Sequence, residues 1–314
     1  MPQGRLAAVD LGTNSCRLKI TDSQGVELYR DSVATKLGEG LIKNHTFTAE
    51  AVERGLKCLS TYAQKMREYA VKDYRAVATA ACRDAANGAN FIRSIEELCG
   101  LKMDVITAKE EALLNIKGAR QNADSSLPFF FVYDLGGGST ELTLATNEEN
   151  PRILYTISVP WGARTASEAF DLLEYDVQKA QKLKKKKKKY TQEFLINSEF
   201  AMYRDQCSCI ATSSTPLRLV HLSQNSTSYK RENADGVTMP VTDYTDAIER
   251  VWQSSFIDMT SNPCIGENRA PIFVAGCVIF RTIYEELQLT SLTASLKGAM
   301  EAIIEDLVQK WQHN

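Results

Sequence analysis

Histidine is scarce in this chain, and the histidines present are far apart. Only three occur among the 314 residues, at positions 45, 221 and 313. This speaks against a nucleophile–histidine triad and against a metal centre built from several histidines. Carboxylates must therefore carry any acid–base chemistry.

Paired cysteine motifs are also missing. The eight cysteines are scattered, and none forms a C-x-x-C pair. A zinc site or a disulfide framework is therefore poorly supported, and we expect buried, reduced thiols.

The chain has no long apolar run and little net charge. No stretch approaches the roughly 18–20 apolar residues that cross a bilayer. The first residues, Met1-Pro2-Gln3-Gly4-Arg5, lead straight into an expected strand without the apolar core of a signal peptide. The net charge of −2 creates no overall field that would recruit nucleic acid. We expect a cytoplasmic protein with neither a membrane nor a nucleic acid as partner.

What the chain does have is a glycine-rich turn between two expected strands. An apolar run from Phe129 ends in Asp134 and meets Gly136, Gly137 and Gly138; a second strand begins near Ser139. Three glycines leave the backbone N–H groups able to converge on an anion. Asp134 and Glu141 bracket the turn and could hold Mg²⁺ through carboxylate oxygens or water. The alternative is a plain hairpin turn with flanking acids.

The same arrangement occurs near the N-terminus. An apolar strand ends in Asp10, continues through Leu11-Gly12 to Thr13-Asn14-Ser15, and is followed by a second expected strand, 16–20. Two Asp-Leu-Gly turns about 120 residues apart suggest two related domains that each offer a phosphate-binding hairpin to a shared cleft. A coincidental repeat is the alternative.

The order of strands and helices predicts an α/β fold with mixed sheets flanked by helices. Two hairpin phosphate loops in paired domains point to the actin-like (ribonuclease H-like) architecture, with a cleft between the domains. We place the first domain at 1–123 and the second at 124–314, with the last helix, 295–312, packing back on the first. Because that superfamily includes kinases, chaperone ATPases and phosphoanhydride hydrolases, the fold alone does not decide function.

Three local expectations can be checked directly. Thr48 should cap a helix whose apolar residues recur at 3–4 spacing. Residues 272–274 should form a strand that leads into a helix at 277–287. The lysine run 184–189 is expected to be a solvated, mobile helix end or loop, with an electrostatic hook for a long polyanion as the alternative.

Two charged residues of the first domain are candidates for the chemistry. Arg83 follows an expected strand and could grip a phosphate oxygen, or simply pair with an acid on the surface. Glu111 lies in the first turn of an expected helix and could deprotonate a water that attacks phosphorus. Glu110 and Glu111 could instead only stabilise the helix dipole. No group suggests a covalent intermediate, so direct, Mg²⁺-assisted phosphoryl transfer remains.

Five stretches together resemble the exopolyphosphatase / guanosine-pentaphosphate phosphohydrolase family, in its order and spacing. They are 8–15 (AVDLGTNS), 37–41 (LGEGL), 79–88 (TAACRDAANG), 110–112 (EEA) and 134–142 (DLGGGSTEL). The likeness is strong over roughly 6–165 and thin beyond. It implies removal of the terminal phosphate of polyphosphate, or of the 5′ γ-phosphate of guanosine pentaphosphate.

The resemblance also implies roles for individual residues. Glu111 would activate water, and Asp134 and Glu141 would position Mg²⁺ and that water, with Asp10 as a further metal ligand. The phosphates would be held by Asn14, Ser15, Arg83, Gly136, Gly137, Gly138 and Ser139.

Two positions depart from the family pattern. The family usually has a Gly-x-x-Gly-Thr turn where this chain has Ala211-Thr212-Ser213-Ser214-Thr215, and an Arg where it has Leu296-Lys297-Gly298. The chain resembles the short, two-domain form, and a homodimer is compatible with it. The alternatives are an ATP-dependent small-molecule kinase and a non-catalytic sensor of polyphosphate or guanosine polyphosphates.

Overall fold

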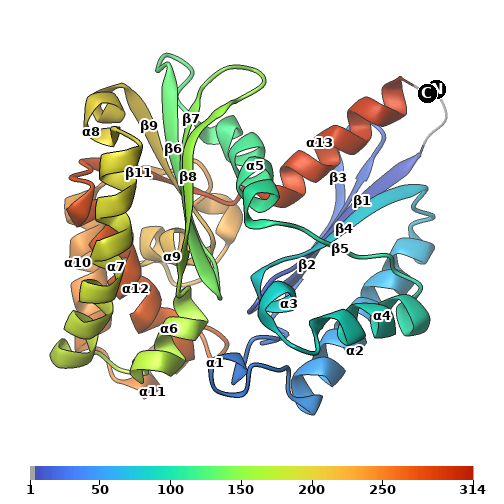
Figure 1. Cartoon of the computed structure of the whole chain (residues 1–314), viewed down its shortest axis with the longest axis horizontal. Helices are drawn as coiled ribbons and strands as arrows, with labels where there is room; N and C mark the ends of the chain where they lie inside the picture. Colours follow the sequence, from blue (N-terminus) through green and yellow to red (C-terminus); the bar gives the residue numbers. More distant parts are fainter. Residues whose placement is uncertain (1–3, 314) are drawn as a thin grey trace. The chain divides into compact units, whose positions relative to one another are not determined.

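The computed structural model describes residues 4–313, which form two compact units (Figure 1). Unit 1 comprises Met1–Leu114 and Ala299–Asn314, and unit 2 comprises Asn115–Gly298. The division expected from the sequence, 1–123 and 124–314, differs from this one at 115–123 and at 299–314. Met1, Pro2 and Gln3, part of the N-terminal stretch considered above, lie outside the described residues.

Unit 1 is built on a five-stranded mixed sheet in the order β3-β2-β1-β4-β5. Strands β1, β2 and β3 are antiparallel neighbours, whereas β4 runs parallel to β1 and β5 parallel to β4. The strands are β1 (Arg5–Leu11), β2 (Cys16–Asp22), β3 (Glu27–Val33), β4 (Asp73–Ala78) and β5 (Asp104–Val105).

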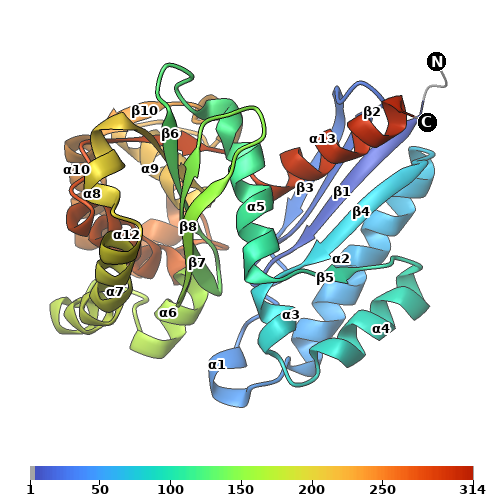
Figure 2. The ribbon, with the colours of Figure 1, turned by 45° about the horizontal axis from the view of Figure 1, so that its top comes forward.

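Helices cover both faces of this sheet. The helices of unit 1 are α1 (Leu41–Asn44), α2 (Ala49–Glu68), α3 (Ala80–Asp84), α4 (Gly88–Cys99), the start of α5 (Ala108–Ala119) and α13 (Ala299–Gln312). As predicted, Thr48 caps α2: its hydroxyl accepts a hydrogen bond from the Ala51 N–H at 3.2 Å. Helices α2 and α4 pack on one face (Figure 2). Residues of α13 pack on the other, against Leu6 and Ala8 of β1.

Unit 2 is built on a six-stranded mixed sheet in the order β10-β11-β9-β6-β7-β8. Strands β6, β7 and β8 are antiparallel neighbours, and β9 runs parallel to both β6 and β11. The strands are β6 (Phe129–Leu135), β7 (Ser139–Thr146), β8 (Ile153–Pro160), β9 (Cys207–Thr212), β10 (Thr238–Pro240) and β11 (Ser291–Ser295).

The large core of unit 2 lies between one face of this sheet and a layer of helices. The helices of unit 2 are the end of α5, α6 (Ala163–Phe170), α7 (Val177–Asn197), α8 (Phe200–Tyr203), α9 (Ser214–Ser223), α10 (Val241–Gln253), α11 (Phe256–Ser261) and α12 (Ala270–Glu286). On the other face, Ile116 and Ala119 of α5 pack against Phe130 and Val132 of β6. The predicted α/β class, with mixed sheets flanked by helices, is confirmed.

The strand predicted at 272–274 is wrong, because those residues belong to helix α12. Thirteen residues of α12 are buried, and the helix packs against α6, α7 and α10. A helix that is buried over most of its surface shows little amphipathic periodicity, so its apolar run cannot be told from a buried strand.

The lysine run lies inside α7, not in a loop or at a helix end. Lysine is compatible with a helix interior. The helix is anchored by a buried stripe at 3–4 spacing, formed by Ala180, Leu183, Lys187, Thr191 and Phe194. No helix within residues 4–313 is long and apolar enough to cross a membrane.

Candidate active site

The first Asp-Leu-Gly turn joins β1 to β2 in unit 1. The Gly12 N–H donates to the Ser15 carbonyl at 3.0 Å, which closes the turn. The 37–41 segment supports it, because the Gly38 N–H donates to the Thr13 carbonyl at 2.8 Å. A Cβ at Gly38 would lie 2.3 Å from Cγ2 of Thr13. Glycine at 38 is thus required by the close approach of this loop to the turn.

The predicted ligands of this turn are buried and already hydrogen-bonded. Asn14 is 5% exposed and Ser15 7% exposed, and the Asn14 Nδ2 donates to the Ser15 Oγ at 3.3 Å. Asp10 lies opposite Arg17 on β2, and the Arg17 Nη1 donates to the Asp10 Oδ2 at 2.9 Å. Asp10 therefore has a cationic partner from its own unit.

Arg83 and Glu111 are brought together within unit 1. Arg83 lies on α3, a short helix that follows strand β4. Its Nη1 donates to the Glu111 Oε2 at 2.9 Å and to the Ile106 carbonyl at 2.7 Å. This ion pair is only 12–22% exposed at the side chains, so Glu111 is held in a defined orientation.

Glu110, the neighbour of Glu111, has a different role. Its Oε2 accepts from the Thr107 N–H at 2.9 Å and from the Thr107 Oγ1 at 3.0 Å. The Thr107 Oγ1 in turn accepts from the Glu110 N–H. The backbone hydrogen bond from Thr107 lowers the pKa of Glu110. Glu110 thus caps α5, and the Thr-x-x-Glu pattern in the sequence was a signal for this.

The triple-glycine turn of unit 2 presents its carbonyls to the start of α6. The Ala163 N–H donates to the Gly136 carbonyl, the Arg164 N–H to the Gly137 carbonyl, and the Gly162 N–H to the Gly138 carbonyl, all at 2.8–2.9 Å. In a trans peptide the following N–H points opposite to its carbonyl, and no peptide within residues 4–313 is cis. The N–H groups of Gly137, Gly138 and Ser139 therefore point away from α6, as an anion cradle requires.

Gly162 allows this approach of α6 to the turn. A Cβ at residue 162 would lie 2.3 Å from the Gly136 carbonyl oxygen and 2.5 Å from the Gly137 carbonyl carbon. Both are backbone atoms that cannot yield without moving the turn. Gly162 was not among the predicted site residues.

Asp134 and Glu141 lie directly opposite one another on β6 and β7. Residues paired in this way point to the same face of the sheet, with Cβ atoms about 5 Å apart. The Asp134 Oδ2 accepts from the Asn115 Nδ2 at 2.7 Å, and the Glu141 Oε1 accepts from the Ser158 Oγ at 2.9 Å. Asn115 and Ser158 orient the two carboxylates, and neither was predicted.

This pair fits the way proteins bind Mg²⁺. Among the described residues, no group of three or more Asp, Glu, His or Cys side chains could hold a metal by itself. Magnesium is typically bound by one or two carboxylates together with waters and substrate phosphates, not by an all-protein cage. Asp134 and Glu141 could provide the two carboxylates. The third predicted ligand, Asp10, lies in unit 1 beside Arg17.

Lys187 supports the glycine turn from the opposite face of the sheet. Although it belongs to the lysine run, it is only 1% exposed. Its Nζ donates to the Thr140 Oγ1 at 3.0 Å and to the Trp161 carbonyl at 2.5 Å. Thr140 follows the turn and Trp161 precedes Gly162. The ammonium group therefore reinforces the direct hydrogen bond that the Thr140 Oγ1 donates to the Trp161 carbonyl at 3.1 Å. Burial lowers the pKa of Lys187 to about 7, partly offset by the charge of Glu141.

The altered turn at 211–215 connects β9 to α9. Ser213 adopts φ 95° and ψ −177°, a conformation that is natural only for glycine. The Thr212 Oγ1 and the Ser213 Oγ are buried without a hydrogen-bond partner among the described residues. The strain thus lies at Ser213, one residue before the position where the family usually has its second glycine.

We expect Ser213→Gly to stabilise the protein by about 1–3 kcal/mol, because glycine adopts this backbone conformation without strain. Equilibrium unfolding in urea would measure the change. Ser214→Gly is the matched control: Ser214 is the first residue of α9, and glycine there should be neutral or destabilising by up to about 1 kcal/mol. Equal effects of the two substitutions would contradict the assignment of strain to Ser213.

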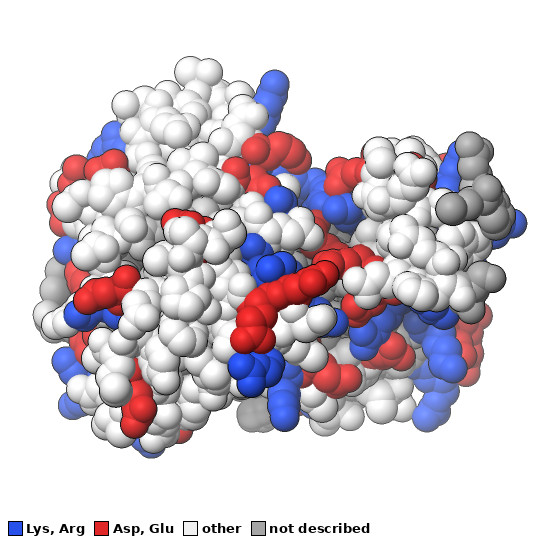
Figure 3. All heavy atoms as spheres, turned by 90° about the horizontal axis from the view of Figure 1, so that it is seen from above, with Lys and Arg blue, Asp and Glu red and all other residues white. Residues whose placement is uncertain are grey.

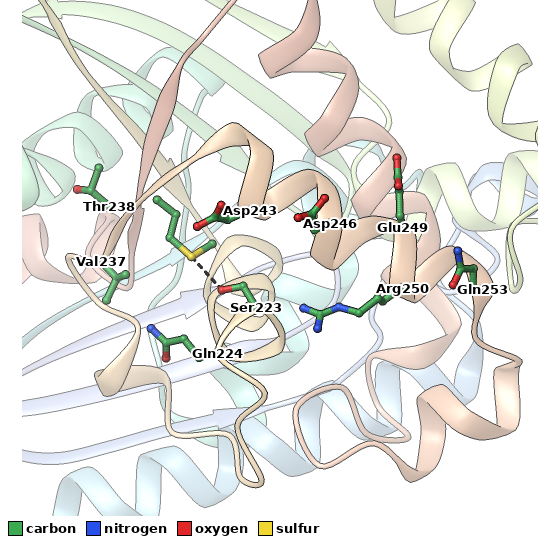
Figure 4. Close-up of a pocket in the computed structure, with 10 residues that line it drawn as sticks. Ser223, Gln224, Val237, Thr238, Asp243, Asp246, Glu249, Arg250 and Gln253 are labelled. Carbon is green, nitrogen blue, oxygen red and sulfur yellow. Dashed lines mark hydrogen bonds between the residues drawn. The ribbon is translucent and has the colours of Figure 1, made fainter.

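A separate pocket of about 650 Å³ lies in unit 2, lined by residues of α9, α10 and β10 (Figure 4). Asp243, Asp246 and Glu249 of α10 contribute three carboxylates to its wall, and Arg250 contributes a cation. None of the predicted site residues lines it. Its acidic lining does not suit a phosphate ligand.

Known proteins resemble this chain in sequence and in fold. Residues 19–311 match the Ppx/GppA phosphatase family. Exopolyphosphatase 2 of Mycobacterium tuberculosis is 36% identical over 156 residues, covering 46% of this chain and 49% of that protein. A bifunctional 3-dehydroquinate synthase/phosphatase of Fusobacterium nucleatum is 38% identical over 149 residues, covering 44% of this chain and 22% of that protein.

Solved structures share the fold over almost the whole chain. An exopolyphosphatase from Cytophaga hutchinsonii has a TM-score of 0.83 at 21% identity and covers 98% of each chain. A Ppx/GppA family member from Aquifex aeolicus has a TM-score of 0.77 at 21% identity and covers both chains completely. These likenesses support the α/β fold with two mixed sheets. With the family match spanning 19–311, the chain belongs to the Ppx/GppA phosphatase family.

Proposed function

We propose that this protein is a Mg²⁺-dependent phosphoanhydride hydrolase. Its substrate would be inorganic polyphosphate, from which it releases the terminal phosphate, or guanosine pentaphosphate, from which it releases the 5′ γ-phosphate. The triple-glycine turn carries the proposal: its carbonyls are held by α6, and its N–H groups point away from that helix. A rigid set of N–H donors suits the oxygens of a phosphoryl group during transfer.

In the proposed reaction, a water oxygen bonds to the terminal phosphorus while the anhydride P–O bond on the opposite side breaks. The Glu111 carboxylate accepts the proton of that water. Arg83, which holds Glu111 at 2.9 Å, also offers N–H groups to a phosphate oxygen. A Mg²⁺ ion held through Asp134 and Glu141 would neutralise phosphate charge. Asn115 and Ser158 keep those two carboxylates oriented.

The family match and the relatives named exopolyphosphatase favour phosphoanhydrides as the substrate class. The relative from Mycobacterium tuberculosis matches this chain over 49% of its own length, so the choice of substrate rests on experiment. The protein should be offered long-chain polyphosphate, tripolyphosphate, guanosine pentaphosphate and ATP in parallel, each with Mg²⁺.

We expect phosphate release from the first three substrates and little from ATP. Chelation of Mg²⁺ with EDTA should abolish release, because two carboxylates alone cannot neutralise the transferred group. Readdition of Mg²⁺ should restore it. Unchanged activity in EDTA would contradict the metal dependence, and ADP together with a phosphorylated acceptor would indicate a kinase instead.

A sensor that binds without hydrolysis is the second candidate. One observation favours it: the 211–215 turn contains a strained Ser213 and two buried hydroxyls without partners within the described part of the chain. Such a turn could hold a ligand in an unproductive position. Tight binding of polyphosphate or guanosine pentaphosphate with no phosphate release would identify the sensor.

A further inference from the structure

Helix α7 carries lysines in three different environments. Lys187 is buried beneath the glycine turn. Three others pair with carboxylates: Lys179 with Asp171 at 2.6 Å, Lys184 with Glu285 at 3.7 Å, and Lys188 with Glu286 at 3.1 Å. The remaining lysines of the helix are exposed and form no ion pair with any residue in the described range 4–313; they are Lys182, Lys185, Lys186 and Lys189.

These four lysines, here called the lysine stripe, share one face of α7. Their positions are i, i+3, i+4 and i+7, the spacing at which side chains lie one above another along a helix. The stripe is about 10 Å long at 1.5 Å per residue. It lies roughly opposite the buried side of the helix, which includes Leu183 and Lys187.

The stripe is a local concentration of positive charge on a protein whose net charge is −2. On the face shown in Figure 3, acidic and basic side chains are interspersed. Lysines at 3–4 spacing repel one another and weaken the helix. A polyanion bound along the stripe would relieve this repulsion and release its own counterions.

The composition of the stripe favours inorganic polyphosphate over nucleic acid. Proteins that bind single-stranded nucleic acid combine basic residues with aromatic side chains on which the bases stack. The stripe contains only lysines, and Tyr190, which follows it, is partly buried against the core. A narrow row of ammonium groups therefore suits a thin, flexible anion without bases.

Helix α7 also connects the stripe to the glycine turn. On its inner face, Lys187 contacts Thr140, which follows the turn, and the carbonyl of Trp161, which precedes Gly162. The outer face of α7 lies one helix diameter, about 10–12 Å, beyond this contact, and Asp134 and Glu141 lie on the opposite face of the sheet. A tripolyphosphate held at the turn is therefore too short to reach the stripe, whereas a long chain can extend to it.

We propose that the lysine stripe binds the distal part of a long polyphosphate chain whose terminal phosphate is held at the glycine turn. The proposal rests on the proposed function for the identity of the substrate. It predicts that the stripe contributes to affinity for long chains only, through salt-dependent contacts with phosphates.

The test compares two variants that lose the same charge. The stripe variant is K182Q/K185Q/K186Q/K189Q. The control variant, K43Q/K57Q/K72Q/K102Q, removes four exposed lysines of unit 1 that form no ion pair among residues 4–313. Binding of long-chain polyphosphate is measured in EDTA across a salt series, and hydrolysis of long-chain polyphosphate and tripolyphosphate is measured with Mg²⁺.

The stripe variant should bind long-chain polyphosphate about tenfold or more weakly at low salt. The slope of log affinity against log salt concentration should be smaller in magnitude by about 2–3, since each phosphate contact to a single-stranded polyanion contributes about 0.7 to that slope. The ratio of kcat/KM for long-chain polyphosphate to that for tripolyphosphate should fall about tenfold. The control variant should change each quantity by less than about twofold, because its lysines lie outside the stripe.

If the two variants lose equal affinity for long-chain polyphosphate, the stripe is not its binding site. The same conclusion follows if kcat/KM falls as much for tripolyphosphate as for long chains. An oligodeoxynucleotide with the same number of phosphates that binds as tightly, and loses affinity in the same variant, would overturn polyphosphate as the occupant. If the wild type hydrolyses none of the substrates while only the stripe variant loses polyphosphate binding, the proposed hydrolase function is wrong. The stripe is then still identified as a polyphosphate-binding site.

Discussion

Replacement of Glu111 by glutamine is expected to lower kcat for phosphate release by about 10²–10⁴, the usual contribution of a general base. Glutamine cannot accept the proton of the attacking water. It can still accept a hydrogen bond from the Arg83 Nη1, which is also held by the Ile106 carbonyl at 2.7 Å. The arginine should therefore stay in place, and the dissociation constant for substrate should change little. Steady-state kinetics and substrate binding measured on the same variant would show this separation.

Glu110 offers a matched control one residue away. In Glu110→Gln the Thr107 N–H exchanges an ionised acceptor for a neutral amide oxygen, which still serves in a capping box, so the helix start should be retained. The variant should keep wild-type kcat at a temperature where it remains folded. Full activity in Glu111→Gln would show that Glu111 is not the general base. Equal losses of kcat in both variants would show that the helix start matters and not the individual carboxylate.

Replacement of Lys187 by methionine is expected to lower kcat/KM by about 10–100-fold. The Trp161 carbonyl and the Thr140 hydroxyl would lose their shared donor, and the turn between Gly136 and Gly138 would lose one of the contacts that fix its position. Displacement of a binding group by about 1 Å can cost about 100-fold in rate. The loss should be accompanied by a higher KM, since the turn is proposed to bind the phosphates.

The same substitution should change how stability depends on pH. The pKa of Lys187 is about 7 in the folded protein, whereas lysine ordinarily titrates near 10.5. Between these values the unfolded chain binds more protons than the folded one, so this residue makes the protein more stable as pH rises. Relative to Lys187→Met, the wild type should gain up to a few kcal/mol between about pH 7 and pH 10. Urea unfolding at several pH values measures this difference.

Lys188→Met is the control for both effects. Lys188 is the next residue of α7, is largely exposed, and pairs with Glu286. Its removal should leave kcat/KM within about twofold and stability within about 1 kcal/mol. If the two substitutions behave alike, the buried ammonium group has no special role at the turn.

The two Asp-Leu-Gly turns could be predicted from the sequence because glycine between two apolar strands is compatible with few other structures. Three successive glycines between apolar strands predict a hairpin that binds anions, and the paired strands β6 and β7 place Asp134 opposite Glu141 as a hairpin requires. Thr48 was a cap signal of the same local kind. Such patterns depend on neighbours in the chain and not on the tertiary structure.

The predictions that failed depend on long-range packing. An apolar run such as 271–280 is compatible with a buried strand as well as with a buried helix. The helix is favoured only by its packing against α6, α7 and α10. Lys187 was treated as solvated because lysine is almost never fully buried. Its burial follows from its alignment with Leu183 and Thr191, a spacing that the surrounding lysines concealed.

Because helix α13 belongs to unit 1 but follows unit 2 in the chain, unit 1 is completed last during synthesis. The sheet of unit 1 is covered on one face by Ile303, Ile304 and Leu307, which are translated after all of unit 2. Until then, Leu6 and Ala8 of β1 have no apolar partner from that helix. Unit 2 can therefore fold while unit 1 still lacks part of its core, and the nascent chain must keep this apolar surface from aggregating until the helix arrives.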